Sequence, residues 1–352
     1  MFRNSMKKIL FSATTFVAVI SLVLAACGDD NDSEGASSAE KPLIVVTTNI
    51  LGDVVTNMVG DSFDVETIMP PGSDPHDFQA SAQQVQTMMS ADLLVVNGAN
   101  FEEGMLDVIE NAESDGVMIF EAVSVVSQLE GSDDHGHGDH DGHEGHDDHD
   151  DHEGHDHDEE KGHDDHDDHE GHDHGGIDPH FFTDPARMAV VAQELSGFLV
   201  ANFPDADQGF VETANDYVKQ LQDLDSEVQE TLSAISSGER LLVTNHAVFA
   251  YFADRYSFTV LGEIIPSSST LASASAQQLA SLAEEIKENQ VKAIFADASS
   301  SDALAQTLAD EVSVVEVINL YTESLGDPGS AGDSYIDMVR FNAEAIASAL
   351  VE

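Results

Sequence analysis

Short apolar runs alternate with amphipathic stretches along most of the chain. The runs are rich in Val, Ile and Leu, and they predict strands at Leu43–Thr47, Val65–Met69, Leu93–Val96, Val117–Phe120, Leu241–Thr244, Phe258–Leu261, Ala293–Ala296 and Val314–Asn319. Helical spacing lies between them, at Leu51–Val59, Ser81–Ser90, Val248–Tyr256, Ala276–Asn289, Asp302–Glu311 and Asp333–Leu350. Strands that alternate with helices predict an α/β fold with parallel sheets.

A long helical region separates the two groups of strands. One helix is predicted over Pro185–Phe203, and a longer one over Asp207–Ile235. The longer stretch carries an apolar stripe at three- and four-residue intervals, made of Phe210, Ala214, Tyr217, Leu221, Leu224, Val228 and Leu232. A helix of about 29 residues would be roughly 43 Å long. It could therefore run along two lobes and join them, and a helical hairpin within one domain is the alternative.

The beginning of the chain has the pattern of a secretory signal. Basic residues up to Lys8 precede the apolar stretch Ile9–Val23, which ends in Leu24-Ala25-Ala26-Cys27. The apolar stretch is short for a membrane span, which needs about 20 residues, so an uncleaved anchor is the weaker alternative. Leu-Ala-Ala-Cys resembles a bacterial lipobox, and Cys27 is the only cysteine. We expect residues 1–26 to be removed, Cys27 to be lipidated, and residues 27–41 to form a flexible tether.

A low-complexity insert covers residues 133–176. Its sequence Gly145–His157 is repeated unchanged at Gly162–His174, and with no apolar core residues we expect it to be disordered. Histidines near neutral pH are largely uncharged and can coordinate metals. We therefore interpret the insert as an accessory metal-collecting loop; the alternative is a tolerated insert with no such role. Its histidines are His135, His137, His140, His143, His146, His149, His152, His155, His157, His163, His166, His169, His172 and His174.

The chain is strongly acidic. Its 68 acidic and 12 basic residues give a formal charge of −56. Such a surface argues against a nucleic-acid partner and against adhesion to anionic lipid, and it attracts cations. A saline habitat is a second possible reason for this composition.

Only three histidines lie outside the insert. His76 follows a predicted strand, His246 lies just after another, where the strand turns into a helix, and His180 precedes the first long helix. Pro75 and Pro179 restrict the backbone directly before two of them. A single histidine is commonly a cap or a core residue, but ligands of α/β sheets gather beyond the carboxyl ends of strands. The joint pattern therefore predicts a metal site.

A closed tetrahedral site requires a fourth ligand. Glu323 follows the last predicted strand, and Asp297 follows the strand before it. Both would lie at the same edge of a parallel sheet as the histidines. We expect Glu323 to be the ligand, with Asp297 as the alternative.

Four stretches of the chain resemble the zinc- and manganese-specific solute-binding proteins of bacterial ABC importers. They are PPGSDPHDF at 70–78, DPHFFTDP at 178–185, NHAVFAYF at 245–252, and TESLG at 322–326 followed by Ser334-Tyr335. The resemblance implies two α/β lobes joined by a rigid long helix, with the metal between them and an ABC permease as partner. His76 and His180 would come from the first lobe, and His246 and Glu323 from the second. The family more often has aspartate where Glu323 stands.

The resemblance implies lobes at 42–204 and 239–352 and a linker helix at 205–238. It implies an extracytoplasmic, lipid-anchored binding protein, expected to be monomeric, and not an enzyme. Imidazole ligands favour zinc over manganese, and since members that bind manganese tend to replace the third histidine by a carboxylate, His246 favours Zn²⁺; Mn²⁺ is the alternative. A secreted zinc metallohydrolase is less favoured because the sequence has no His-Glu-x-x-His motif. A surface adhesin or metal buffer is a third reading.

Overall fold

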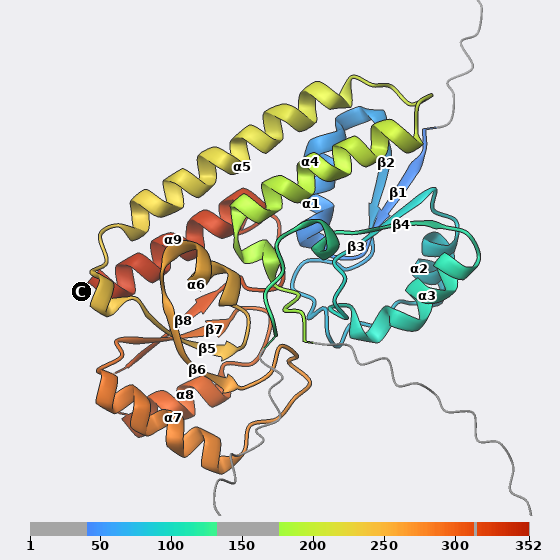
Figure 1. Cartoon of the computed structure of the whole chain (residues 1–352). Coiled ribbons are helices and arrows are strands. Elements are labelled where there is room, and N and C mark those ends of the chain that lie inside the picture. Colours follow the sequence, from blue (N-terminus) through green and yellow to red (C-terminus); the bar gives the residue numbers. More distant parts are fainter. Residues whose placement is uncertain (1–40, 132–175, 313–314, 352) are drawn as a thin grey trace, which may run out of the picture. The chain divides into compact units, whose positions relative to one another are not determined.

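The computed structural model describes residues 41–131, 176–312 and 315–351. The expectations for the signal segment, for Cys27, for the tether and for the histidines of the insert lie outside these ranges. Two four-stranded parallel sheets form the framework, which confirms the predicted fold class (Figure 1). The first has the order β2-β1-β3-β4, with β1 at Leu43–Val46, β2 at Asp64–Thr67, β3 at Leu93–Val96 and β4 at Met118–Glu121.

Three helices connect the strands of the first sheet: α1 at Asn49–Val59, α2 at Ala82–Met89 and α3 at Leu106–Ser114. Helix α1 begins after Thr48, whose side chain accepts the N–H of Leu51. Helix α2 begins with a reciprocal capping box between Ser81 and Gln84. Helix α3 was not predicted. Unlike α2, it has no capping side chain at its N-terminus, so its start carries no clear signal in the sequence.

The second sheet has the order β6-β5-β7-β8 and is also parallel throughout. Its strands are β5 at Leu241–His246, β6 at Thr259–Ile265, β7 at Ala293–Asp297 and β8 at Glu316–Leu320. The helices of this half are α6 at Ala250–Tyr256, α7 at Ala276–Asn289, α8 at Ala303–Val312 and α9 at Tyr335–Val351. The carboxyl ends of β5, β7 and β8 carry or precede the polar residues singled out above.

Helices α4 (Pro185–Asn202) and α5 (Phe210–Leu232) come after the strands of the first sheet and before those of the second along the chain. They pack against each other. Helix α5 contacts α1 of the first lobe and α9 of the second, as the predicted linker should (Figure 1). The predicted bounds 207–235 were too wide at both ends. Asp207 accepts the N–H of Gly209 in a turn, and the Ser233 hydroxyl bonds back to the carbonyl of Glu230 beyond the helix end. Within the described ranges, no helix combines the length and apolar character that crossing a bilayer requires.

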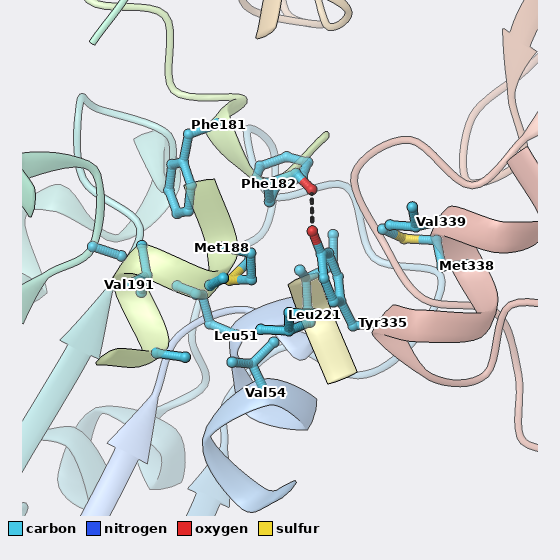
Figure 2. Close-up of a cluster of buried hydrophobic side chains, with 14 of the residues drawn as sticks. Leu51, Val54, Phe181, Phe182, Met188, Val191, Leu221, Tyr335, Met338 and Val339 are labelled. Atoms are coloured by element: carbon cyan, nitrogen blue, oxygen red, sulfur yellow. Dashed lines mark hydrogen bonds between the residues drawn. The ribbon is translucent and has the colours of Figure 1, made fainter. Parts of the chain in front are cut away.

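One continuous apolar core includes residues from both lobes and from α4 and α5. Figure 2 shows part of it, where Leu221 of α5 lies among residues of α1, α4 and α9. The Tyr335 hydroxyl of α9 donates to the carbonyl of Phe182, 2.8 Å away (Figure 2). Since a large shared apolar interface resists relative domain motion, we infer that this core restrains the two lobes.

Candidate metal site

The structure brings together His76, His180, His246 and Glu323, all of them buried. His246 is the last residue of β5, and Glu323 lies just beyond β8. His76 lies in the loop between β2 and α2, and His180 directly precedes the short 3₁₀ helix η4 (Phe181–Thr183). One possible ligand atom from each side chain lies within 4.8 Å of all the others.

A single carboxylate oxygen is the meeting point of the cluster. Oε1 of Glu323 lies 2.9 Å from Nε2 of His76, 3.1 Å from Nε2 of His180 and 3.0 Å from Nε2 of His246. Ligand bonds of about 2.0–2.1 Å in a tetrahedral zinc site would separate ligand atoms by about 3.4 Å. The donors thus already lie close to that spacing, with all three imidazoles aimed at one point.

Asp297 does not join this group. It is buried at the end of β7, where its carboxylate accepts the backbone N–H and the hydroxyl of Ser299, both at 2.8 Å. Burial and the nearby charge of Glu323 raise the pKa of Asp297 to about 6. The structure therefore places Glu323, and not Asp297, beside the histidines.

Two Asp-Pro-His turns present His76 and His180. In each, the aspartate two residues earlier accepts the backbone N–H of the histidine, from His76 to Asp74 at 2.9 Å and from His180 to Asp178 at 2.8 Å. Such a side-chain turn, followed by a proline of fixed φ, limits the positions that the histidine backbone can take. The repeated motif thus holds the backbone of His76 and that of His180 in a fixed position.

The second ring nitrogen of each of these histidines is held by a carboxylate. Nδ1 of His76 lies 3.0 Å from Oε1 of Glu103, and Nδ1 of His180 lies 2.8 Å from Oδ1 of Asp178. A carboxylate at Nδ1 fixes the tautomer and leaves Nε2 to face a metal. Nδ1 of His246 is buried and has no hydrogen-bond partner among the described residues.

A tight loop after β3 supplies Glu103 and an apolar wall. Gly98, Ala99 and Asn100 have positive φ values of 87°, 50° and 58°, so the backbone reverses sharply. The ring of Phe101 then lies edge-on to those of His76 and His180, at centroid distances of 5.1 and 5.5 Å. Its burial excludes water from that side of the cluster.

Glu102 anchors the same loop from beneath. Its fully buried carboxylate accepts the Thr47 hydroxyl and the N–H of Asn97, both at 2.6 Å, and the N–H of Gly98 at 3.3 Å. Burial raises the pKa of Glu102, against the effect of these hydrogen bonds. The loop geometry that places Glu103 therefore depends on a buried acid that the sequence pattern did not single out.

The cluster without metal behaves as a network of charged hydrogen bonds. Burial lowers the pKa of His76, but hydrogen bonds with Glu103 and Glu323 outweigh burial and raise it to about 10. Burial likewise opposes the charge on His180, whose pKa is nevertheless raised by Asp178 and Glu323. Burial would raise the pKa of Glu323, but the histidines, His246 first, hold it well below its usual range.

Sequence reasoning missed several residues that shape this cluster. Asp178 was within reach, because Asp-Pro-His occurs twice and the first residue of a repeated motif deserves the same scrutiny as the third. Glu103 and Phe101 gave no such signal, since they lie more than 20 residues from His76 and reach it only through the loop after β3.

These features define a class: a two-lobe α/β binding protein with a buried histidine–carboxylate cluster at the carboxyl ends of its strands. The chain belongs to the ZnuA family, described as zinc-uptake complex component A, periplasmic, whose profile matches residues 44–349. This confirms the family resemblance found in the sequence. The family is a substrate-binding component of a transport system and not an enzyme, which removes the metallohydrolase reading.

Relatives match over nearly their whole length. The manganese ABC transporter substrate-binding lipoprotein PsaA of Streptococcus anginosus is 27% identical over 353 residues, covering 98% of this chain and 99% of the relative. The manganese-binding lipoprotein MntA of Halalkalibacterium halodurans is 25% identical, with the same coverage of 98% and 99%. The periplasmic zinc binding protein TroA from Treponema pallidum has the same fold, with a TM-score of 0.70, 24% identity, and coverage of 89% of this chain and 100% of TroA.

Proposed function

We propose that this chain captures zinc with His76, His180, His246 and Glu323 and delivers it to an ABC permease. The observation that carries the proposal is the convergence of three Nε2 atoms on one carboxylate oxygen. The other oxygen of Glu323, Oε2, is buried and has no hydrogen-bond partner among the described residues. Burying a carboxylate oxygen without a partner costs free energy, and a cation bound to that oxygen would remove the cost.

The choice of zinc rests on ligand chemistry. Three imidazole nitrogens and one carboxylate suit zinc, whereas manganese is better matched by oxygen ligands. The manganese-binding relatives named above make Mn²⁺ the competing cargo. The carboxylate of Glu323 would support either ion, so His246 is the residue on which the preference depends.

We further propose an extracytoplasmic location with a lipid anchor at Cys27, and a monomer as the working form. The relatives PsaA and MntA are named as lipoproteins, which supports this location. Incorporation of a labelled fatty acid by the wild-type chain, and none by Cys27→Ser, would support the anchor. Equal labelling of both chains would contradict it.

Competitive titration of the mature chain with zinc and manganese tests the cargo. We expect one tight zinc site per chain and weaker manganese binding, because the donor set is rich in nitrogen. In His246→Asp, which replaces a nitrogen by an oxygen ligand, the ratio of zinc to manganese affinity should fall at least tenfold. A wild-type preference for manganese would overturn the zinc assignment and leave the metal site itself in place.

The same titration on a chain without residues 133–176 separates the site from the insert. If the four residues form the tight site, its affinity should survive the deletion, and only weaker additional binding should be lost. Loss of the tight site with the deletion would contradict the assignment and place the metal in the insert.

A further inference from the structure

A serine-rich segment of the second lobe, Pro266–Ser273, reaches across to the first lobe beside the histidine cluster. The hydroxyl of Thr270 donates to Oδ2 of Asp74, 2.8 Å away. The neighbouring Ser269 lines the same surface recess as Glu103, and its side chain helps His76 to lower the pKa of that carboxyl. Both carboxylates belong to the first lobe, and both hydroxyl side chains come from this one segment.

The two carboxylates are also the groups that hold His76. The other oxygen of Asp74, Oδ1, accepts the His76 backbone N–H at 2.9 Å, and Glu103 holds Nδ1 of the ring at 3.0 Å. Asp74 therefore contacts His76 through one oxygen and the hydroxyl of Thr270 through the other, and Glu103 contacts the His76 ring while Ser269 favours its charged form. Movement of the segment away from the first lobe would loosen both supports of His76.

The contacts of Thr270 and Ser269 with the first lobe lie on the side of the metal site that faces solvent. A recess of about 650 Å³ is lined by His76, Glu103, Ser268 and Ser269, among others. Glu103 is partly exposed there, whereas His180, His246 and Glu323 are sealed off. His76 is therefore the ligand nearest to water, and the segment lies at its side of the cluster.

We propose that Thr270 and Ser269 form an interlobe clasp that slows metal release by keeping His76 in its ligating position. The proposal rests on the proposed function and adds a kinetic role for residues that touch no metal. Ion release requires the site to loosen at one ligand, and the ligand next to solvent is the one that the clasp restrains. Thr270 and Ser269 are thus positioning residues for His76.

The test is the rate at which zinc leaves the loaded mature chain in excess chelator. Thr270→Val keeps the shape of the side chain and removes the hydroxyl, and we expect zinc to leave about three- to tenfold faster, the size of effect for one typical net hydrogen bond. Thr270→Ser retains the hydroxyl and should restore the wild-type rate. Ser269→Ala should act in the same direction as Thr270→Val.

Thr307→Val is the matched control, because the Thr307 hydroxyl bonds to the carbonyl of Ala303 within its own helix α8, away from the junction between the lobes. It should leave the release rate unchanged. Wild-type release from Thr270→Val, or equal acceleration by Thr307→Val, would overturn the clasp while zinc binding stands. A wild-type chain without a tight zinc or manganese site would overturn the proposed function together with the clasp.

Discussion

Glu323 is the residue on which the cluster depends, because each of the three histidines contacts its Oε1 atom. Without this carboxylate, the three Nε2 atoms would face one another with no acceptor between them, because Glu103 and Asp178 contact only the Nδ1 atoms of His76 and His180. Burial and the nearby negative charge of Glu323 raise the pKa of Asp297, but the carboxylate oxygens of Asp297 accept hydrogen bonds from Ser299. The two acids therefore differ in role.

Glu323→Ala should lower zinc affinity by at least about 100-fold, because it removes a ligand and the negative charge that would contact the cation directly. Asp297→Asn should lower it by less than about tenfold, since it removes only a neighbouring charge. Calorimetric titration of both variants at one pH measures the difference. A larger loss in Asp297→Asn would make Asp297 the fourth ligand.

Proton release should accompany zinc binding. The pKa of His76 is raised from 6.5 to about 10 in the metal-free protein, so near neutral pH its ring carries a proton that zinc must displace. Zinc affinity should therefore rise with pH up to about 10. Titrations in two buffers of different ionisation enthalpy would give different heats, and equal heats would contradict the prediction.

The same shifts set the pH dependence of the metal-free fold. The folded-state pKa of His76 is raised, so its stabilising contribution is complete below pH 6.5 and is lost as pH rises through about 10. The folded-state pKa of Glu323 is depressed, so its contribution is present above about pH 4.5 and is lost as pH falls through the folded value. Urea unfolding in the presence of a chelator should thus show the greatest contribution of the cluster between about pH 4.5 and 6.5. Rising stability from pH 7 to 10 would contradict this.

At the scale of elements, the strands and most helices could be predicted because each has a clear apolar period and a polar boundary. Helix α7, for example, was predicted at its observed bounds Ala276–Asn289, and a capping box at Ser275 and Gln278 defines its start. Helix α3 was missed because no capping side chain marks its start, whereas α2, which also buries a single residue fully, begins with a capping box at Ser81 and Gln84. The ends of α5 were misplaced because side-chain hydrogen bonds at Asp207 and Ser233 stop a pattern that the sequence would allow to continue.

The candidate site divides in the same way. His76, His180, His246 and Glu323 could be singled out because each stands beside a predicted element boundary. The partners of their rings could not, since Glu103 meets His76 only after the chain has folded through β3 and a left-handed loop. Local sequence patterns predict which residues lie at the carboxyl ends of the strands, but they do not predict which side chains from distant parts of the chain contact them.

Because α5 and α9 share one apolar core, we expect substitutions in either helix to destabilise the whole fold. Leu221→Ala should reduce the free energy of unfolding by about 2–5 kcal/mol, and Tyr335→Phe by about 1–2 kcal/mol because the Phe182 carbonyl loses its donor. Val190→Ala, at a position 41% exposed on α4, is the control and should cost less than about 0.5 kcal/mol. Chemical unfolding should remain a single transition in each variant. Separate transitions for the two lobes would contradict a common core.

At the scale of the whole molecule, charge dominates. With 68 acidic against 12 basic residues, the folded chain repels itself, and dissolved ions screen that repulsion. Raising sodium chloride from about 0.01 M to about 1 M should raise the midpoint of thermal unfolding by about 5 °C in metal-free protein. Scanning calorimetry with a chelator present checks this, with sucrose as an uncharged comparison. A flat or falling midpoint would show that the acids are already compensated.

The antiparallel bridge between Glu130 and Ile177 has a practical consequence. The N–H of Asp178 also bonds the carbonyl of Leu129 at 2.9 Å, so the fold is fastened just outside residues 131 and 176. Inserted domains are tolerated best at exposed loop tips, and hydrogen bonds in the flanking backbone keep the rest of the fold in place. A fluorescent protein inserted in place of residues 132–175 would therefore be joined to two backbone segments that are already hydrogen-bonded to each other. Gly176 and Ile177 also line the recess that includes His76. This junction is therefore the natural place to build a genetically encoded metal sensor from the chain.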